Sequence, residues 1–113
     1  MRQECRVTVH EDNELTTIEV MGNLTAAAEE AMDTAYQQAC RHNTRKILTK
    51  FDGESRINSA GIAIMIDLVM ESREKRIQIF VSGLSNQSQK IFELVGLTKY
   101  VTVVTSEEEV RGS

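Results

Sequence analysis

The sequence contains no tryptophan, and aromatic residues make up only 4% of its 113 residues. Proteins that bind single-stranded nucleic acid stack the bases on aromatic side chains, so such a platform is not expected. The net charge is −4, with acidic and basic residues mixed along the chain. Because a nucleic-acid surface usually needs a basic stripe, we predict no nucleic-acid partner.

Long apolar runs and proline are also absent. No window reaches the roughly 18 apolar residues of a membrane-spanning helix, and the first ten residues lack an apolar segment of signal-peptide length. We therefore expect a cytoplasmic protein without a membrane span. Cys5 and Cys40 are the two cysteines. Without a sign of secretion, free thiols are favoured over a disulfide.

Enzyme motifs are missing as well. The sequence has no glycine-rich phosphate loop and no dinucleotide-binding fingerprint. His10 and His42 have no histidine or cysteine partner at metal-ligand spacing. Asp52 and Glu54, beside Gly53, are typical of a solvated turn. We predict no catalytic residue, no metal and no cofactor, so an enzyme is the less favoured interpretation.

The apolar residues follow the two periods of strands and helices. The expected order is a β-hairpin with a turn at 11–14, followed by helix, strand, helix, strand, helix, strand and helix. The predicted strands cover residues 5–10, 17–20, 46–51, 77–82 and 100–105, and the predicted helices cover 26–42, 59–75 and 86–95 and begin again at 106. This order predicts one α/β domain over residues 1–113, with helices packed on a mixed sheet of about five strands.

Residues that start and stop helices support these boundaries. Thr25 and Ser85 are predicted N-caps, because serine and threonine oxygens accept hydrogen bonds from free backbone N–H groups. Gly96 is a natural C-terminal stop. Ser106 and Glu109 have the spacing of a capping box.

The most unusual segment is "RINSAGIAIMIDLVMES", residues 56–72, in which a small polar cluster precedes an almost unbroken apolar helix. A local interpretation is that Asn58 or Ser59 caps the helix and does nothing more. That interpretation does not explain why the helix also has large apolar residues on a second side.

The two sides follow from a rotation of about 100° per residue. The core face consists of Ile62, Met65, Ile66, Val69 and Met70. Ile64 and Leu68 lie nearly opposite, so either a neighbouring helix, with 85–95 as the candidate, or a partner protein covers them. We predict that at least one of these two side chains is exposed and belongs to a partner surface.

The motifs "INSAG" and "FELVGL", with their spacing, resemble the STAS domain family of the anti-sigma factor antagonist type. "MGNLT" after the second predicted strand also fits, and the resemblance covers nearly the whole chain. It implies that Ser59 is phosphorylated by a partner that is both anti-sigma factor and serine kinase. The unphosphorylated protein would bind this partner and free the sigma factor. The sequence departs from the family pattern at Asn58, usually Asp, at Ala60, usually Ser or Thr, and at Lys50, often Asp.

The resemblance implies a regulator that acts by binding. The predicted partner-binding residues are Asn58, Ser59, Ala60, Gly61, Ile64 and Leu68. Two other roles stay open, a STAS subunit of a lipid-transport ABC system that docks on an ATPase and a STAS scaffold domain of a signalling assembly. A weak homodimer also stays open.

Overall fold

The computed structural model describes residues 5–12, 15–41 and 44–112. Its sheet has five strands in the order β1-β2-β3-β4-β5. The strands are β1 (Arg6–Asp12), β2 (Leu15–Met21), β3 (Lys46–Phe51), β4 (Gln78–Ser82) and β5 (Val101–Val103). β1 and β2 pair antiparallel, and the other neighbours pair parallel. The predicted hairpin and mixed sheet are confirmed, but positions 11 and 12 of the predicted turn belong to β1. Positions 13 and 14 lie outside the described residues.

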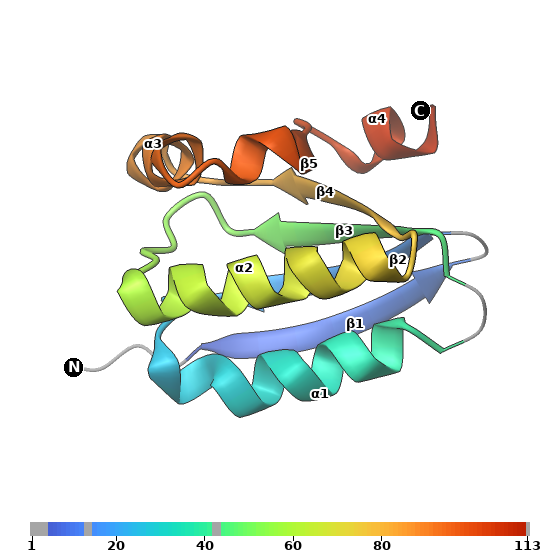
Figure 1. Cartoon of the computed structure of the whole chain (residues 1–113), viewed down its shortest axis with the longest axis horizontal. Helices are drawn as coiled ribbons and strands as arrows, with labels where there is room; N and C mark the ends of the chain where they lie inside the picture. Colours follow the sequence, from blue (N-terminus) through green and yellow to red (C-terminus); the bar gives the residue numbers. More distant parts are fainter. Residues whose placement is uncertain (1–4, 13–14, 42–43, 113) are drawn as a thin grey trace.

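Three helices lie side by side on one face of this sheet, with α2 between α1 and α3 (Figure 1). The helices are α1 (Glu29–Ala39), α2 (Ser59–Glu74), α3 (Asn86–Leu94) and α4 (Glu107–Arg111), and short 3-10 turns cover Ala26–Ala28 and Leu97–Lys99. Crossovers between parallel strands are right-handed almost without exception. Because the strand order advances in one direction, each crossover helix falls on the same face.

The main core lies between the sheet and these three helices. It contains Ile18 and Ile47 from the sheet, Met32 from α1, Met65 from α2 and Phe92 from α3. A smaller cluster lies on the opposite face, where α4 covers one end of the sheet, and consists of Leu15, Leu48, Phe80, Val104 and Val110. β4 is therefore buried on both faces.

The predicted helix starts and stops are largely confirmed, although α1 ends at Ala39, three residues before the predicted end at 42. Thr25 Oγ1 accepts a hydrogen bond from Ala27 N–H at 3.3 Å, Ser85 Oγ accepts one from Ser88 N–H at 3.1 Å, and Gly96 has a φ of 83°. The predicted capping box is half formed: the Ser106 side chain makes no cap hydrogen bond, but the Glu109 carboxylate accepts from the backbone N–H of Ser106. The same carboxylate also accepts from Thr105 N–H at 2.7 Å.

Two further sequence predictions concern thiols and membrane helices. Cys5 and Cys40 are half-buried free thiols, as predicted. None of the helices in the described ranges is long and apolar enough to cross a bilayer.

Candidate functional site

The polar cluster that precedes α2 lies at the edge of the sheet where the parallel strands β2, β3 and β4 end (Figure 1). Binding sites in open α/β sheets form at this edge, because the loops that leave neighbouring strands meet there. Three segments come together at this place: residues 22–25 after β2, residues 52–58 after β3, and the start of α3 after β4. We call the second of these, residues 52–58, the α2 entry loop.

Asp52 organises the α2 entry loop. Its carboxylate accepts hydrogen bonds from Gly22 N–H at 3.0 Å, from Glu54 N–H at 2.8 Å and from Ser55 Oγ at 2.9 Å. Burial alone would raise the pKa of Asp52, but these hydrogen bonds stabilise the charged form and hold its pKa below the ordinary value. Asp52 is exposed, as predicted for a turn residue, but its three hydrogen bonds were not predicted. The Asp-Gly-x-Ser sequence was the available signal, because aspartate side chains often bond to backbone groups two residues on.

The segment after β2 holds the same loop from the other side. Leu24 and Ile57 form an isolated parallel β-bridge, in which Leu24 N–H donates to Arg56 O at 2.9 Å and Asn58 N–H donates to Leu24 O at 3.3 Å. Asn23 Oδ1 also accepts from Arg56 N–H at 3.0 Å. These bonds fix the path of the chain immediately before α2.

The start of α3 supplies the third attachment. Ser88 is buried, and its Oγ donates a hydrogen bond to Ser55 O at 3.2 Å. The α2 entry loop is thus bonded to segments that follow both neighbouring strands. We infer that it presents the first residues of α2 from a rigid base.

Asn58 and Ser59 begin α2 as the sequence predicts. Asn58 is the N-cap, and its Oδ1 accepts from Gly61 N–H at 2.9 Å. Ser59 is the first helical residue and is exposed to solvent. Within residues 5–12, 15–41 and 44–112, the N–H groups of Ser59 and Ala60 have no hydrogen-bond acceptor.

The electrostatics of this helix end favour an anion. The first turn of α2 contains no acidic residue, and its cap, Asn58, is neutral. The positive end of the helix dipole is therefore not offset by a negative charge in the first turn of α2. Two free N–H groups beside an exposed hydroxyl are the arrangement in which helix N-termini bind phosphate.

Gly61 permits the close approach of α2 to the segment after β2. It is buried, and a Cβ atom added there would lie 2.2 Å from Leu24 O and 2.8 Å from the Ile57 side chain. No side chain fits this space. The glycine of the "INSAG" motif therefore acts through backbone packing, and a partner protein does not reach it.

Leu68 is not on an exposed surface, which corrects the sequence prediction for this residue. Its side chain is 5% exposed and belongs to the main core. Ile64 is half-buried, so neither residue is fully exposed. The covering helix is α1, which lies beside these residues, whereas the sequence suggested the helix at 85–95 (Figure 1).

The predicted partner-binding residues therefore separate into two groups. Asn58 and Ser59 are exposed, and Ala60 and Ile64 are half-buried. A docked protein could contact these four directly. Gly61 and Leu68 lie inside the domain and hold the first four in place.

The substitution at Lys50 does not bear on Ser59. Lys50 follows the period of Leu48, which belongs to the cluster on the far face of the sheet, whereas Ile47 and Phe51 face the three helices. Side chains two residues apart on a strand share a face. Lys50 and Ser59 therefore lie on opposite sides of the sheet.

Replacing Asp52 should give a pH-dependent loss of stability. Asp52→Asn is expected to lower the free energy of unfolding by about 1 kcal/mol at about pH 7, since the group is exposed and solvent weakens its hydrogen bonds. The folded pKa lies below the unfolded one, so this stability is complete above the ordinary carboxyl pKa and is lost as the pH falls through the folded pKa. Urea unfolding at about pH 7 and about pH 2.5 measures the difference.

Glu54→Gln is the matched control for this substitution, because Glu54 is an exposed carboxylate in the same loop. We expect its stability to stay within about 0.5 kcal/mol of the original chain. If the loss of stability in Asp52→Asn were the same at low pH as at about pH 7, the role given to the Asp52 carboxylate would be contradicted.

The comparison with protein families agrees with this arrangement. A sequence model of the STAS domain matches residues 6–110. The chain belongs to the STAS domain family. A search of curated proteins finds no match.

Solved structures of similar fold include an anti-sigma factor antagonist from Mycobacterium paratuberculosis, with 14% sequence identity, a TM-score of 0.78 and coverage of 94% of this chain and 90% of that one. The unphosphorylated anti-sigma factor antagonist SpoIIAA matches with 19% identity, a TM-score of 0.75 and coverage of 96% and 98%. The phosphorylated form of SpoIIAA, a Bacillus cell fate determinant, matches with 18% identity, a TM-score of 0.63 and coverage of 94% and 97%. At these identities the likeness concerns the fold.

Proposed function

We propose that this chain is a cytoplasmic anti-sigma factor antagonist that regulates transcription by switching partners. In its unphosphorylated form it binds an anti-sigma factor and so frees the sigma factor. The anti-sigma factor is also a serine kinase, and its phosphorylation of Ser59 ends the binding. The observation that carries this proposal is the exposed Ser59 hydroxyl at a rigidly held helix N-terminus in a STAS domain.

The helix end can accept a phosphate without loss of the fold. A phosphate adds about −1.5 to −2 charges and three strong acceptor oxygens. The free N–H groups of Ser59 and Ala60 and the neutral Asn58 cap offer this charge a favourable local field. Asn58 in place of the usual aspartate strengthens this effect, because one carboxylate near the new charge is missing. A fold-preserving modification is what a reversible switch requires.

The same phosphate should be incompatible with a docked partner. Asn58, Ser59 and Ala60 form a small surface beside a rigid loop, and a partner that covers it must remove water from Ser59. Burying a phosphate without a cation costs several kcal/mol. This cost exceeds the free energy gained from the apolar contacts of one or two side chains. SpoIIAA, which shares this fold, has been described in both phosphorylated and unphosphorylated forms.

A binding role is preferred to catalysis at Ser59. A serine nucleophile needs an adjacent base. His10 lies on β1, beside Glu19 at 3.7 Å and on the face of the sheet away from α2, while His42 lies outside the described residues. No group of three potential metal ligands occurs among the residues that the structure describes. We therefore propose that Ser59 accepts a phosphoryl group from a partner enzyme and has no catalytic role of its own.

Phosphorylation is expected at Ser59 and at no other hydroxyl of the α2 entry loop or β3. The experiment incubates the chain with ATP and the anti-sigma factor kinase of the same organism and locates phosphate by mass spectrometry. Ser55 and Thr49 are 3% and 0% exposed, so a kinase cannot reach them in the folded domain. Ser59→Ala should abolish incorporation. Phosphate on Ser55 or Thr49 with Ser59 unmodified would contradict the proposal.

A further inference from the structure

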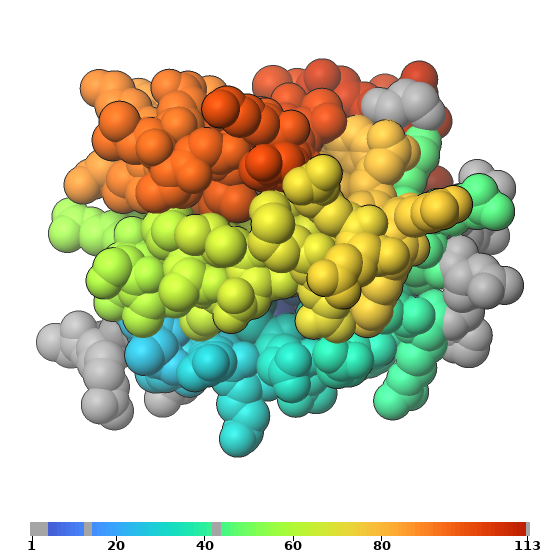
Figure 2. Space-filling model, in the orientation of Figure 1, coloured from blue at the N-terminus to red at the C-terminus, as the bar shows by residue number. Residues whose placement is uncertain are grey.

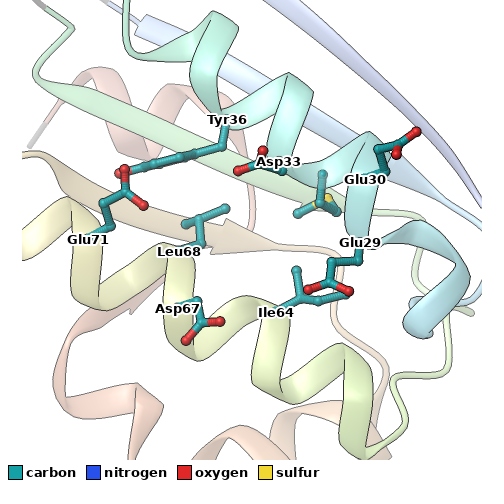
Figure 3. Close-up of a pocket in the computed structure, with 9 residues that line it drawn as sticks. Glu29, Glu30, Asp33, Tyr36, Ile64, Asp67, Leu68 and Glu71 are labelled. Carbon is teal, nitrogen blue, oxygen red and sulfur yellow. The ribbon is translucent and has the colours of Figure 1, made fainter.

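A groove of about 370 Å³ runs between α1 and α2, away from the start of α2. Figure 3 shows the side chains that line it, with Tyr36 reaching in from α1, and Ile64 and Leu68 from α2. The furrow between the two helices is visible on the surface in Figure 2. The floor is apolar, because Met32 also lies beneath it.

Carboxylates form both rims of this groove. Those of α1 are Glu29, Glu30 and Asp33, and those of α2 are Asp67 and Glu71. These five negative charges exceed the net charge of the whole chain, which is −4. Within the described ranges, Glu29, Glu30, Asp33 and Asp67 take part in no ion pair. The groove therefore concentrates negative charge that the domain itself does not neutralise.

One end of the groove shows how a cation fits there. Lys75 Nζ lies 2.9 Å from Glu71 Oε2 and 5.0 Å from the centre of the Tyr36 ring. A lysine combines an apolar stem with a charged head, so its methylene groups can cover apolar surface while the ammonium group reaches a carboxylate. The chain's own lysine thus combines a carboxylate contact with an aromatic contact, the pairing expected for a bound ammonium group.

We propose that this groove binds a lysine-rich amphipathic segment of a partner protein. The apolar residues of that segment would lie over Ile64 and the floor, and its lysines would meet the two carboxylate rims. Grooves between helices commonly receive an amphipathic segment in this way. The carboxylates are spread along two helices and do not converge as three metal ligands, so an extended polycation fits them better than a single metal ion.

This groove is a second surface, independent of the switch proposed at Ser59. At about 100° per residue, Ser59 is rotated by roughly 130° from the middle of the α2 side of the groove, which Ile64, Asp67, Leu68 and Glu71 define. The chain could therefore contact one partner through both surfaces or two partners in turn. The groove would still bind its ligand if Ser59 were never phosphorylated.

The test uses a fluorescent synthetic peptide of leucine and lysine that forms an amphipathic helix, titrated with the full chain and followed by anisotropy. The groove variant Asp33→Lys with Asp67→Lys reverses one exposed charge on each rim. We expect it to weaken binding by about tenfold or more. The control Glu93→Lys with Glu108→Lys makes the same change in net charge at exposed sites on α3 and α4 and should leave affinity within about twofold.

Three further arms complete the experiment. Amide chemical shifts should move at Ile64 and Glu71 when peptide is added to the original chain, and Ser59→Glu should bind the peptide as the original chain does. Equal weakening of peptide binding in the groove and control variants would show that the peptide responds only to net charge. No weakening in either variant would show that the peptide binds elsewhere on the domain. Displacement of the peptide by spermine at equal concentration would assign the groove to free polyamines. Each of these three outcomes would overturn the proposal.

Discussion

Leu68→Asp should unfold the domain or bring it close to unfolding, with a loss of about 4 kcal/mol in the free energy of unfolding. Leu68 is 5% exposed, and the groove next to it is lined with carboxylates, so an aspartate there would find like charges nearby. The expected loss is a large fraction of the roughly 5–15 kcal/mol that stabilises a domain of ordinary size. Urea unfolding followed by circular dichroism measures it.

Ala63→Asp is the control for this result, because Ala63 lies on the same helix and is exposed. We expect a change within about 0.5 kcal/mol for Ala63→Asp. If Leu68→Asp instead folded with the stability of the original chain and lost only partner binding, Leu68 would be a surface residue. The packing of α1 against α2 described above would then be wrong.

Gly61→Ala should destabilise the domain by about 3 kcal/mol, although the same change usually stabilises a helix. Alanine in place of glycine within a helix gains about 1 kcal/mol in the absence of other contacts. At Gly61 the new Cβ would lie 2.2 Å from the backbone oxygen of Leu24, so the start of α2 must move away. That movement strains or breaks the hydrogen bonds of the bridge between Leu24 and Ile57, and overpacking with lost hydrogen bonds outweighs the gain.

Gly112→Ala provides the comparison for Gly61→Ala. A Cβ atom at Gly112 would have its nearest neighbour at 3.5 Å, an ordinary contact distance, and its φ is −85°. The free energy of unfolding of this variant is expected to lie within about 0.5 kcal/mol of that of the original chain. A Gly61→Ala protein that is as stable as Gly112→Ala would show that α2 and the Leu24 segment are not held as closely as described.

The order of helices and strands was predictable from the sequence because local signals agree with the fold. Period-two alternation marks β1, and Thr25, Ser85 and Gly96 lie at helix ends with the expected hydrogen bonds or backbone angle. The start of α2 was predictable in the same way, because an asparagine N-cap depends mainly on residues next to it in the sequence.

The neighbours of α2 were harder to predict, because they depend on the order of strands in the sheet. A helical projection separated Ile64 and Leu68 from the core face but could not assign the helix that covers them. The strand order β2-β3-β4-β5 places α2 between α1 and α3, so α2 is covered on both flanks. The right-handed crossover rule assigns each helix to a face only when the strand order is known, and no local pattern in the sequence specifies that order.

The candidate site was predictable at Ser59 but not in its supports. Hydrogen bonds from Gly22 to Asp52 and from Arg56 to Asn23 join residues 30 or more positions apart, and no local pattern specifies such pairs. The groove was missed for the same reason. Its rims come from two helices, and nothing in the sequence showed that these helices lie next to each other. The acidic residues of each helix were visible in the sequence.

The most direct measurement is a calorimetric titration of the anti-sigma factor kinase with two forms of the chain, unmodified and phosphorylated at Ser59. Both forms should show the same circular dichroism spectrum, because the helix end accommodates the phosphate. We predict that phosphorylation weakens binding by about 100-fold or more, equivalent to roughly 3 kcal/mol. Equal affinities for the two forms would contradict a phosphorylation-controlled switch at Ser59.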